Sequence, residues 1–161
     1  AFVKYSGYMT ERKVLIGIDP GKMTGITVLD YTIPEDISII YQDELDVVGF
    51  MTYIRDIPQL FSGDRVSIIY ETFIITTETG KKTQQHFSLE LIGVIKYLCW
   101  TNGYSMESSK PSDKAFGTND KLRRSGLWYV GGEGHANDSA RHALRWLVRK
   151  FPRQMAHVLV D

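Results

Sequence analysis

The 161-residue sequence has little of several features that would restrict its function at once. Its single cysteine, Cys99, excludes an internal disulfide framework and a cysteine-rich zinc site. No apolar run approaches the length needed to cross a bilayer, and residues 1–13 lack the apolar stretch of a signal peptide. Repeats, low-complexity tracts and linkers are also missing. We therefore expect a cytoplasmic protein without a membrane partner, built as one domain over residues 1–161, with residues 1–12 as a candidate flexible extension.

Net charge is also absent, because 19 Lys and Arg balance 19 Asp and Glu. The balance hides a split along the chain. Residues 1–79 hold six basic and twelve acidic side chains, whereas residues 80–161 hold thirteen and seven. Such asymmetry indicates a polyanion such as nucleic acid as a partner, although two differently charged solvent faces would explain it equally well.

Apolar runs and turn residues predict a mixed α/β fold that opens on strands. The expected strands cover residues 14–18, 25–29, 37–42 and 65–70, with a short extended piece at 104–107. The first two flank a Pro-Gly-Lys turn and should form an antiparallel hairpin, and the fourth is apolar enough to be central. The expected helices, covering both faces of the sheet, are 46–61 (N-cap Asp46), 83–101, 119–124 and 135–151.

Two acidic residues directly follow strongly apolar strands. Asp19 ends the run Val14–Ile18, and Glu71 ends the run 65–70. If these strands are neighbours, the two carboxylates meet at one edge of the sheet, where they repel each other and need a cation. Ligation by oxygen atoms alone favours Mg²⁺ or Mn²⁺. The alternative is that both are ordinary solvated acids at strand ends.

The last expected helix begins with His135 and carries Asp138 one turn later. Both lie opposite the apolar stripe of that helix, so neither is needed in the core. Asp138 could instead simply stabilise the positive helix N-terminus. The same polar side is predicted to continue as a basic track that could meet phosphates, or as an ordinary solvated face, through Arg141, His142, Arg145 and Arg149.

Together these motifs resemble those of the RuvC-like Holliday junction resolvases in the RNase H-like nuclease superfamily, and look most like the phage-encoded members. The matching residues are Gly17-Ile18-Asp19-Pro20-Gly21 with Gly25, then Ile68-Ile69-Tyr70-Glu71, then His135-Ala136-Asn137-Asp138-Ser139-Ala140 with Ala143-Leu144. The resemblance covers residues 13–151. It implies an RNase H-like fold with a mixed five-stranded sheet, a homodimer, and Mg²⁺-dependent cleavage of branched DNA, in a host-cell cytoplasm if the chain is phage-encoded.

The resemblance also implies roles for individual residues. Asp19, Glu71, His135 and Asp138 match the catalytic metal ligands, with two Mg²⁺ per active site, for which Mn²⁺ can substitute, and no organic cofactor. His135 stands where many relatives carry an aspartate. A softer, neutral imidazole would hold Mg²⁺ less tightly or favour Mn²⁺, or would orient or deprotonate the attacking water. The implied chemistry is in-line attack of water on a phosphodiester, leaving 5′-phosphate ends.

Further residues are assigned to DNA. Lys110 and Lys121 resemble two family lysines near the scissile phosphate, which makes Lys121 a catalytic candidate. Lys81 and Lys82 lie in a polar stretch that the family places against the junction. Phe73 could stack on an exposed base, although a place in the core explains it at least as well. The remaining expected DNA contacts are Lys114, Arg141 and Arg145.

Three other functions remain open at this point. The same carboxylates would serve a nuclease acting on RNA, RNA–DNA hybrids or genome ends. A non-catalytic nucleic-acid module is a second alternative, against which the three intact acids argue. An actin-like nucleotide-binding domain is the third, and the chain is too short for its second lobe. For a dimer, the candidate interface is the apolar face of helix 83–101, where Tyr97 and Trp100 remain outside the stripe expected to be buried.

Overall fold

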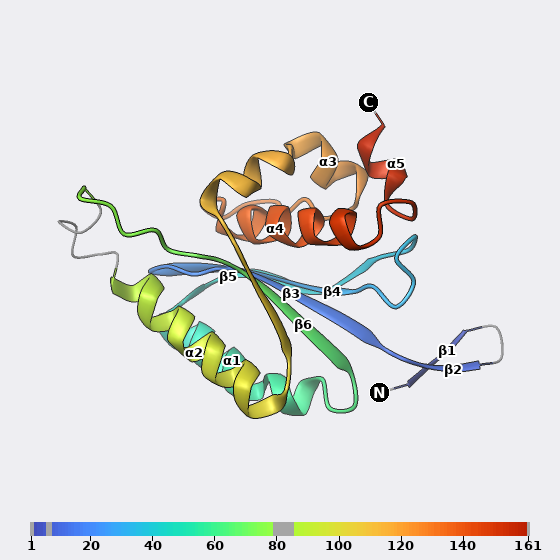
Figure 1. The fold of residues 1–161 in the computed structure, drawn as a ribbon, viewed down its shortest axis with the longest axis horizontal. Helices are drawn as coiled ribbons and strands as arrows, with labels where there is room; N and C mark the ends of the chain where they lie inside the picture. The colour runs from blue at the N-terminus through green and yellow to red at the C-terminus, as the bar shows by residue number, and fades with distance from the viewer. Residues whose placement is uncertain (1, 6–7, 79–85, 161) are drawn as a thin grey trace.

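The computed structural model describes residues 2–5, 8–78 and 86–160, and its centre is a mixed five-stranded sheet with the order β5-β4-β3-β6-β7 (Figure 1). The strands are β3 (Lys13–Asp19), β4 (Met23–Asp30), β5 (Ser38–Asp46), β6 (Arg65–Glu71) and β7 (Ser105–Ser109). The hairpin of β3 and β4 is antiparallel, as is the pair of β4 and β5. β6 runs parallel to β3, and β7 runs parallel to β6. The predicted sheet class and the central place of the fourth predicted strand are confirmed.

Helices cover both faces of this sheet, as predicted (Figure 1). One face packs against α1 (Val47–Leu60) and α2 (His86–Asn102). The other packs against α4 (His135–Lys150), with the short elements η3 (Pro111–Phe116), α3 (Asn119–Arg124) and α5 (Ala156–Leu159) around it. None of the helices in the described part of the chain has the length and apolar character that a bilayer crossing requires.

The central strands are buried on both sides, which explains their continuous apolar sequence. Alternate residues of β3 point to opposite cores, so Ile16 packs toward α1 and α2 whereas Leu15 packs toward α4. On the α4 side a glycine in β3 allows a very close approach: a Cβ atom on Gly17 would lie 2.5 Å from the carbonyl oxygen of Ser139. The first turns of α4 therefore lie directly against the hairpin.

The boundaries differ from the sequence prediction in several places. β5 extends to Asp46, whose carboxylate then caps α1 by accepting the backbone N–H of Gly49 at 2.7 Å. The 3₁₀ helix η3 lies between Pro111 and Gly117, where the sequence predicts only small elements of unspecified type. In the segment expected to be an extension, β1 (Phe2–Tyr5) and β2 (Tyr8–Glu11) pair as a separate two-stranded sheet. The flexibility of that segment stays a prediction, and residues 83–85 of the second expected helix lie outside the described residues.

Candidate active site

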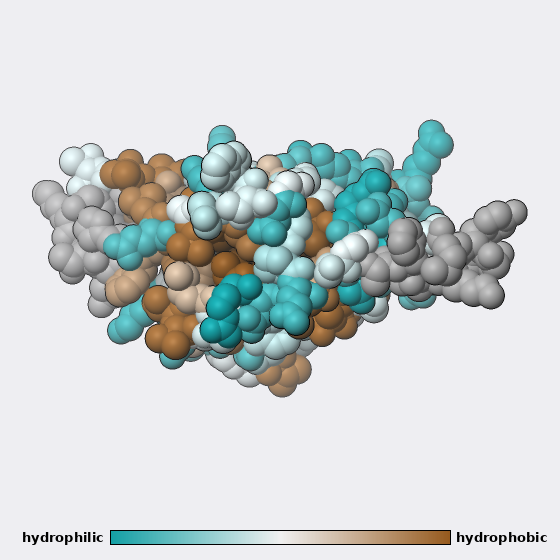
Figure 2. Space-filling model, turned by 90° about the horizontal axis from the view of Figure 1, so that it is seen from below, coloured by the Kyte–Doolittle hydropathy of each residue, from teal (hydrophilic) through white to brown (hydrophobic). Residues whose placement is uncertain are grey.

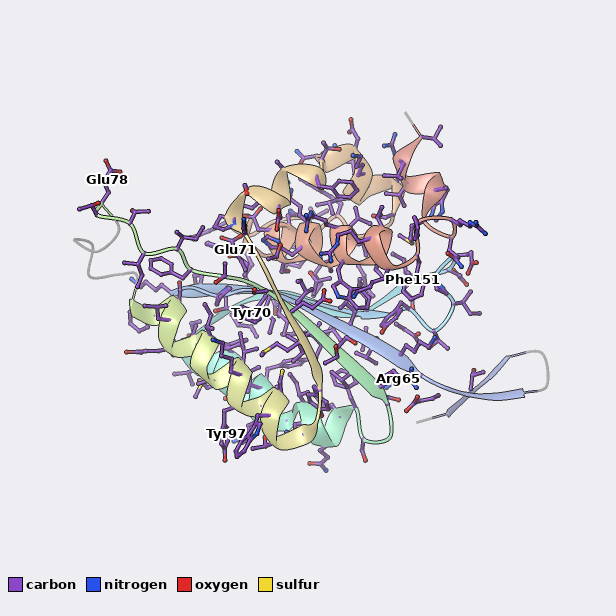
Figure 3. The ribbon with its side chains drawn as sticks, in the orientation of Figure 1. Arg65, Tyr70, Glu71, Glu78, Tyr97 and Phe151 are labelled. Atoms are coloured by element: carbon purple, nitrogen blue, oxygen red, sulfur yellow. The ribbon has the colours of Figure 1, made fainter. Side chains whose placement is uncertain are left out.

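The predicted acids meet at one edge of the sheet. Asp19 ends β3 and Glu71 ends β6, and these neighbouring parallel strands finish side by side. Figure 3 shows Glu71 at the end of β6 on the side that faces α4. α4 brings the other two candidates to the same place: His135 Nδ1 lies 3.2 Å from Asp19 Oδ2, and a single amine contacts both Asp138 and Glu71.

That amine belongs to Lys114, which the sequence assigned to DNA. Its Nζ atom lies 2.9 Å from Asp138 Oδ2 and 3.4 Å from Glu71 Oε2, so the ammonium bridges the two carboxylates. Lys121, the predicted catalytic lysine, instead donates to the carbonyl oxygen of Phe116 at 3.2 Å and lies over the ring of that residue. Lys110 is exposed at the start of η3.

The electrostatics of the site centre on Asp19. Burial, followed by repulsion from Glu71, raises the pKa of the Asp19 carboxyl to about 6, although the His135 hydrogen bond and the charge of Lys114 act in the opposite direction. Burial lowers the pKa of the Lys114 amine, but its hydrogen bond to Asp138 and the surrounding carboxylates outweigh this and raise it. The single positive charge of Lys114 therefore offsets only part of the negative charge of Asp19, Glu71 and Asp138.

This partial neutralisation bears on metal binding. Across residues 2–5, 8–78 and 86–160, no three His, Cys, Asp or Glu side chains stand in an arrangement that could hold a metal ion. Lys114 occupies the position between two of the acids that a cation would take. The donor set, three carboxylates and an imidazole, suits a hard divalent ion, and the raised pKa of Asp19 shows that further positive charge would be stabilising there. The residue types therefore fit a hard divalent ion, whereas the spacing of the described side chains forms no metal site.

The predicted basic track on α4 is only partly correct. Arg141 is held within the protein: it contacts Asp138 Oδ1 at 2.6 Å, the Gly117 carbonyl oxygen at 2.8 Å and Asn119 Oδ1 at 2.5 Å. Arg145 lies 3.4 Å from a carboxylate oxygen of Asp113.

The placement of His142 on the polar side of α4 is wrong. Its side chain is completely buried, and its Nε2 atom lies 2.7 Å from Glu71 Oε2. The buried surface of α4 is wider than the predicted apolar stripe, because Asn137, Ser139 and His142 are buried beside it. The helix is pressed so closely against the sheet that polar positions at the margins of the stripe are also covered.

Comparisons with known proteins give matches at the level of structure. No family model matches the sequence, and no curated protein matches it. Two structures of Thermus thermophilus RuvC, one of them in complex with a Holliday junction substrate, match at TM-scores of 0.63 and 0.60 with 13% identity, over 86% of this chain and 95–96% of theirs. The fowlpox virus resolvase in complex with Holliday junction DNA matches at 0.55 with 15% identity, over 84% of this chain and 99% of its own. The chain has the RuvC-like resolvase fold.

A carboxylate that the sequence did not single out holds this RuvC-like fold together at the site. Glu44 on β5 accepts backbone N–H groups from Glu133 at 2.7 Å, Gly134 at 2.8 Å and Ala136 at 3.1 Å. Helix α4 begins after Gly134, which has φ 104° and no side chain to serve as a cap. The sequence signal was a helix start preceded by Gly-Gly-Glu-Gly, which supplies no Ser, Thr, Asp or Asn at the cap and therefore requires an acceptor from elsewhere.

Other predicted DNA contacts have different positions in the RuvC-like fold. Phe73 is partly buried and packs against the core on the α1–α2 side, as the alternative explanation proposed. Lys81 and Lys82 lie outside the described residues.

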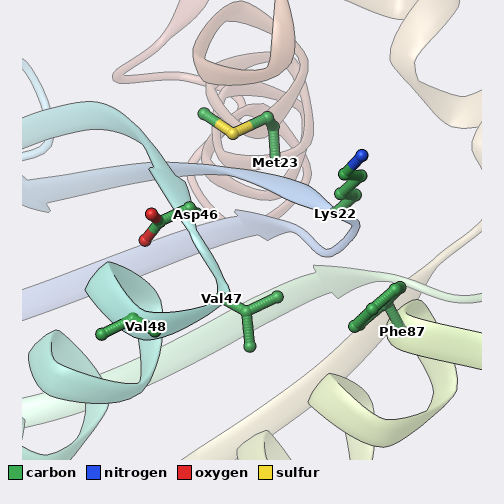
Figure 4. A pocket seen from close by; sticks show the side chains of 6 residues that line it. All are labelled: Lys22, Met23, Asp46, Val47, Val48 and Phe87. Atoms are coloured by element: carbon green, nitrogen blue, oxygen red, sulfur yellow. The ribbon is translucent and has the colours of Figure 1, made fainter.

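A pocket of about 340 Å³ lies beside the hairpin turn (Figure 4). It forms where the start of β4, the junction of β5 with α1, and α2 come together. Its lining residues are Lys22, Met23, Asp46, Val47, Val48 and Phe87. None of the four candidate metal ligands contributes to this lining, so the pocket is separate from the carboxylate site.

Proposed function

We propose that this protein is a structure-selective endonuclease that hydrolyses phosphodiester bonds in branched DNA, such as Holliday junctions, flaps or forks. The observation that carries the proposal is the convergence of Asp19, Glu71 and Asp138 at one sheet edge around the amine of Lys114. Acids that are buried close together repel one another and destabilise the fold, so their convergence indicates a functional site. Two of the compared structures that share the RuvC-like fold are complexes with Holliday junction DNA, which supports branched DNA as the substrate class.

In the proposed mechanism Asp19, Glu71, His135 and Asp138 hold two Mg²⁺ ions, or Mn²⁺ in their place. When bound there, such ions would activate a water as the nucleophile and would stabilise the leaving 3′ oxygen. Lys114, displaced from the carboxylates, donates a hydrogen bond to the scissile phosphate. With Nδ1 on Asp19, His135 has only Nε2 left, which would serve either as a metal ligand or, alternatively, to orient or deprotonate the attacking water. The products carry 5′-phosphate ends.

The proposed DNA surface extends beyond the carboxylates. Lys110, Lys81 and Lys82 contact backbone phosphates, and Lys121 acts near the scissile phosphate after release from Phe116. Arg141 and Arg145, held by Asp138 and Asp113, would add positive charge beside this surface. Phe73 is only partly buried, and its ring would stack on a base at the branch point.

Resolving a four-way junction requires cuts in two strands. A homodimer would present one of two equivalent sites to each strand. Figure 2 shows apolar side chains gathered on the face of the molecule that α1 and α2 form. On α2, Tyr97 is 66% exposed and Trp100 is 82% exposed, with ring centroids 6.5 Å apart. We propose this outward face of α2 as the dimer interface. Light scattering tests it: Trp100→Glu should give monomers, whereas Val130→Glu, at an equally exposed apolar residue, should leave the dimer intact.

The decisive experiment is cleavage of matched four-way, flap, linear duplex and RNA–DNA hybrid substrates with Mg²⁺ and with Mn²⁺. We expect the wild type to nick the branched DNAs and not the other substrates. The Asp19→Asn and Asp138→Asn variants should bind a junction but not cut it. Preferential cutting of the hybrid would favour the alternative nuclease function. Undiminished cutting by both variants would contradict the site, and junction binding without any metal-dependent cutting would favour a non-catalytic module.

A further inference from the structure

A buried histidine lies behind the carboxylate of Glu71. His142 belongs to the middle of α4, and its ring reaches the sheet with Nε2 2.7 Å from Glu71 Oε2 and Nδ1 2.8 Å from Ser109 Oγ. Glu71 and Ser109 are register partners at the ends of the parallel strands β6 and β7. The imidazole therefore bridges the side chains of a cross-strand pair at the edge where the acids meet.

The ring is fixed from the side away from Glu71. Ser109 Oγ donates to Asp113 Oδ2 at 3.1 Å, and the same carboxylate oxygen accepts the backbone N–H of Lys110 at 2.9 Å. That backbone hydrogen bond is the largest of the contributions that hold the pKa of Asp113 below its ordinary value. The Glu71 carboxylate can only accept, so Nε2–H of His142 donates to it, and the contact between Nδ1 and Ser109 Oγ holds the other side of the ring. The chain of contacts runs from Glu71 through the interior to the start of η3.

We propose that His142 is a positioning residue that holds the Glu71 carboxylate in its metal-binding orientation, an inference that rests on the proposed function. A glutamate side chain has several rotatable bonds, and fixing one carboxylate oxygen removes the rotamers that would turn it away from Asp19. Lys114 also contacts Glu71, at 3.4 Å, but it is the group that must move when a cation enters. His142 is the partner that stays, because its side chain is enclosed by the helix and the sheet.

Two substitutions separate positioning from simple filling of space. The amide nitrogen of glutamine reaches about as far as Nε2 of histidine, whereas that of asparagine reaches about as far as Nδ1. His142→Gln therefore keeps a donor for Glu71 and loses the contact with Ser109, and His142→Asn does the reverse. Both place a neutral amide in the same buried space, so a purely structural role predicts that they behave alike.

The first readout is Mn²⁺ affinity, measured by calorimetry on the full chain without DNA. We expect His142→Gln to stay within about 3-fold of the wild type and His142→Asn to bind at least about 10-fold more weakly, in the range typical of partners behind metal ligands. In cleavage of a four-way junction, kcat should fall in the same order while KM for DNA is unchanged. His157→Asn, the same change at an exposed histidine of α5, is the matched control and should alter neither.

Ser109→Ala serves as a second variant should both His142 proteins fail to fold, because it leaves Glu71 and His142 in place and removes only the anchor of the ring. It should weaken Mn²⁺ binding by about 3-fold or more. Equal affinities for the two His142 variants, or unchanged affinity in Ser109→Ala, would overturn the positioning role while leaving the proposed nuclease standing. A wild type that neither binds Mn²⁺ nor cuts branched DNA would overturn both.

Discussion

A Cβ atom on Gly25 would overlap the carbonyl oxygen of His135. Gly25 is also the register partner of Asp19 in the hairpin. Gly25 thus lets His135, the first residue of α4, contact β4 directly beside Asp19. The absence of a side chain on Gly25 sets the distance between α4 and β4. The site depends on backbone packing as much as on its charged groups.

Gly25→Ala should therefore damage both the fold and the site. The added methyl group has no flexible side chain to displace, so the start of α4 must move, at a cost of about 3 kcal/mol or more. Urea unfolding and Mn²⁺ binding should both show the loss. Gly93→Ala on α2 is the control, because a Cβ atom there meets nothing within 4 Å, and it should gain about 0.5–1 kcal/mol through helix propensity. Similar stabilities for the two variants would contradict the close approach.

The Lys114 amine and a metal ion should compete for the same carboxylates. Lys114→Met removes the bridging charge and should cost about 1 kcal/mol in EDTA, a figure reduced for the 35% exposure of the side chain. The Mn²⁺-induced rise in melting temperature should then exceed that of the wild type, since no ammonium has to be displaced. Arg153→Met, at an exposed residue between α4 and α5, should change neither value. A smaller Mn²⁺ response in Lys114→Met would mean that the lysine assists metal binding.

The local elements of this fold could be predicted because their signals are local. The strand ending at Asp19, the cap at Asp46 and the short helix after Thr118 each depend on residues within one or two turns of themselves. The convergence of Asp19 and Glu71 was predicted only on the condition that their strands are neighbours, and the parallel pairing of β3 and β6 meets that condition.

The parts that could not be predicted depend on contacts between distant segments. Lys114 rather than Lys121 reaches the acids because of the path of η3, a helix without a clear sequence pattern. His142 is polar and alternates with arginines, and only the width of the α4 contact shows that it is buried. Glu44 caps a helix that starts 91 residues later in the chain, and spacing alone gives no sign of it.

Asp19→Asn should stabilise the protein in EDTA. The pKa of Asp19 is raised from 3.8 to about 6, so the folded state binds this proton more tightly than the unfolded state does. Ionisation then costs stability, with no penalty below pH about 4 and the full penalty, about 3 kcal/mol, above pH about 6. Melting temperatures from pH 4 to 8 should show a gain for Asp19→Asn that appears as pH rises. Asp120→Asn, at a side chain that is 80% exposed, should show no such gain.

Glu44 should have the opposite pH dependence. Burial raises the pKa of its carboxyl, but the hydrogen bonds from Glu133, Ala136 and Gly134 together outweigh this and lower it. A lowered pKa contributes stability above the unfolded value and loses it as pH falls through the folded value. Glu44→Gln leaves backbone donors at the start of α4 with a weaker acceptor, and should cost about 1 kcal/mol at pH 7 after allowance for solvent exposure.

The difference in melting temperature between Glu44→Gln and the wild type should shrink as the pH is lowered from 7 to 3, because protonation removes the same charge from the wild type. Glu35→Gln, in the loop between β4 and β5, is a control that should follow the wild type throughout. Because α4 carries His135 and Asp138, Glu44→Gln should also weaken Mn²⁺ binding at pH 7. A loss of stability without any loss of Mn²⁺ affinity would mean that the helix keeps its position without the cap, and that close packing at Gly25 is sufficient to hold the site.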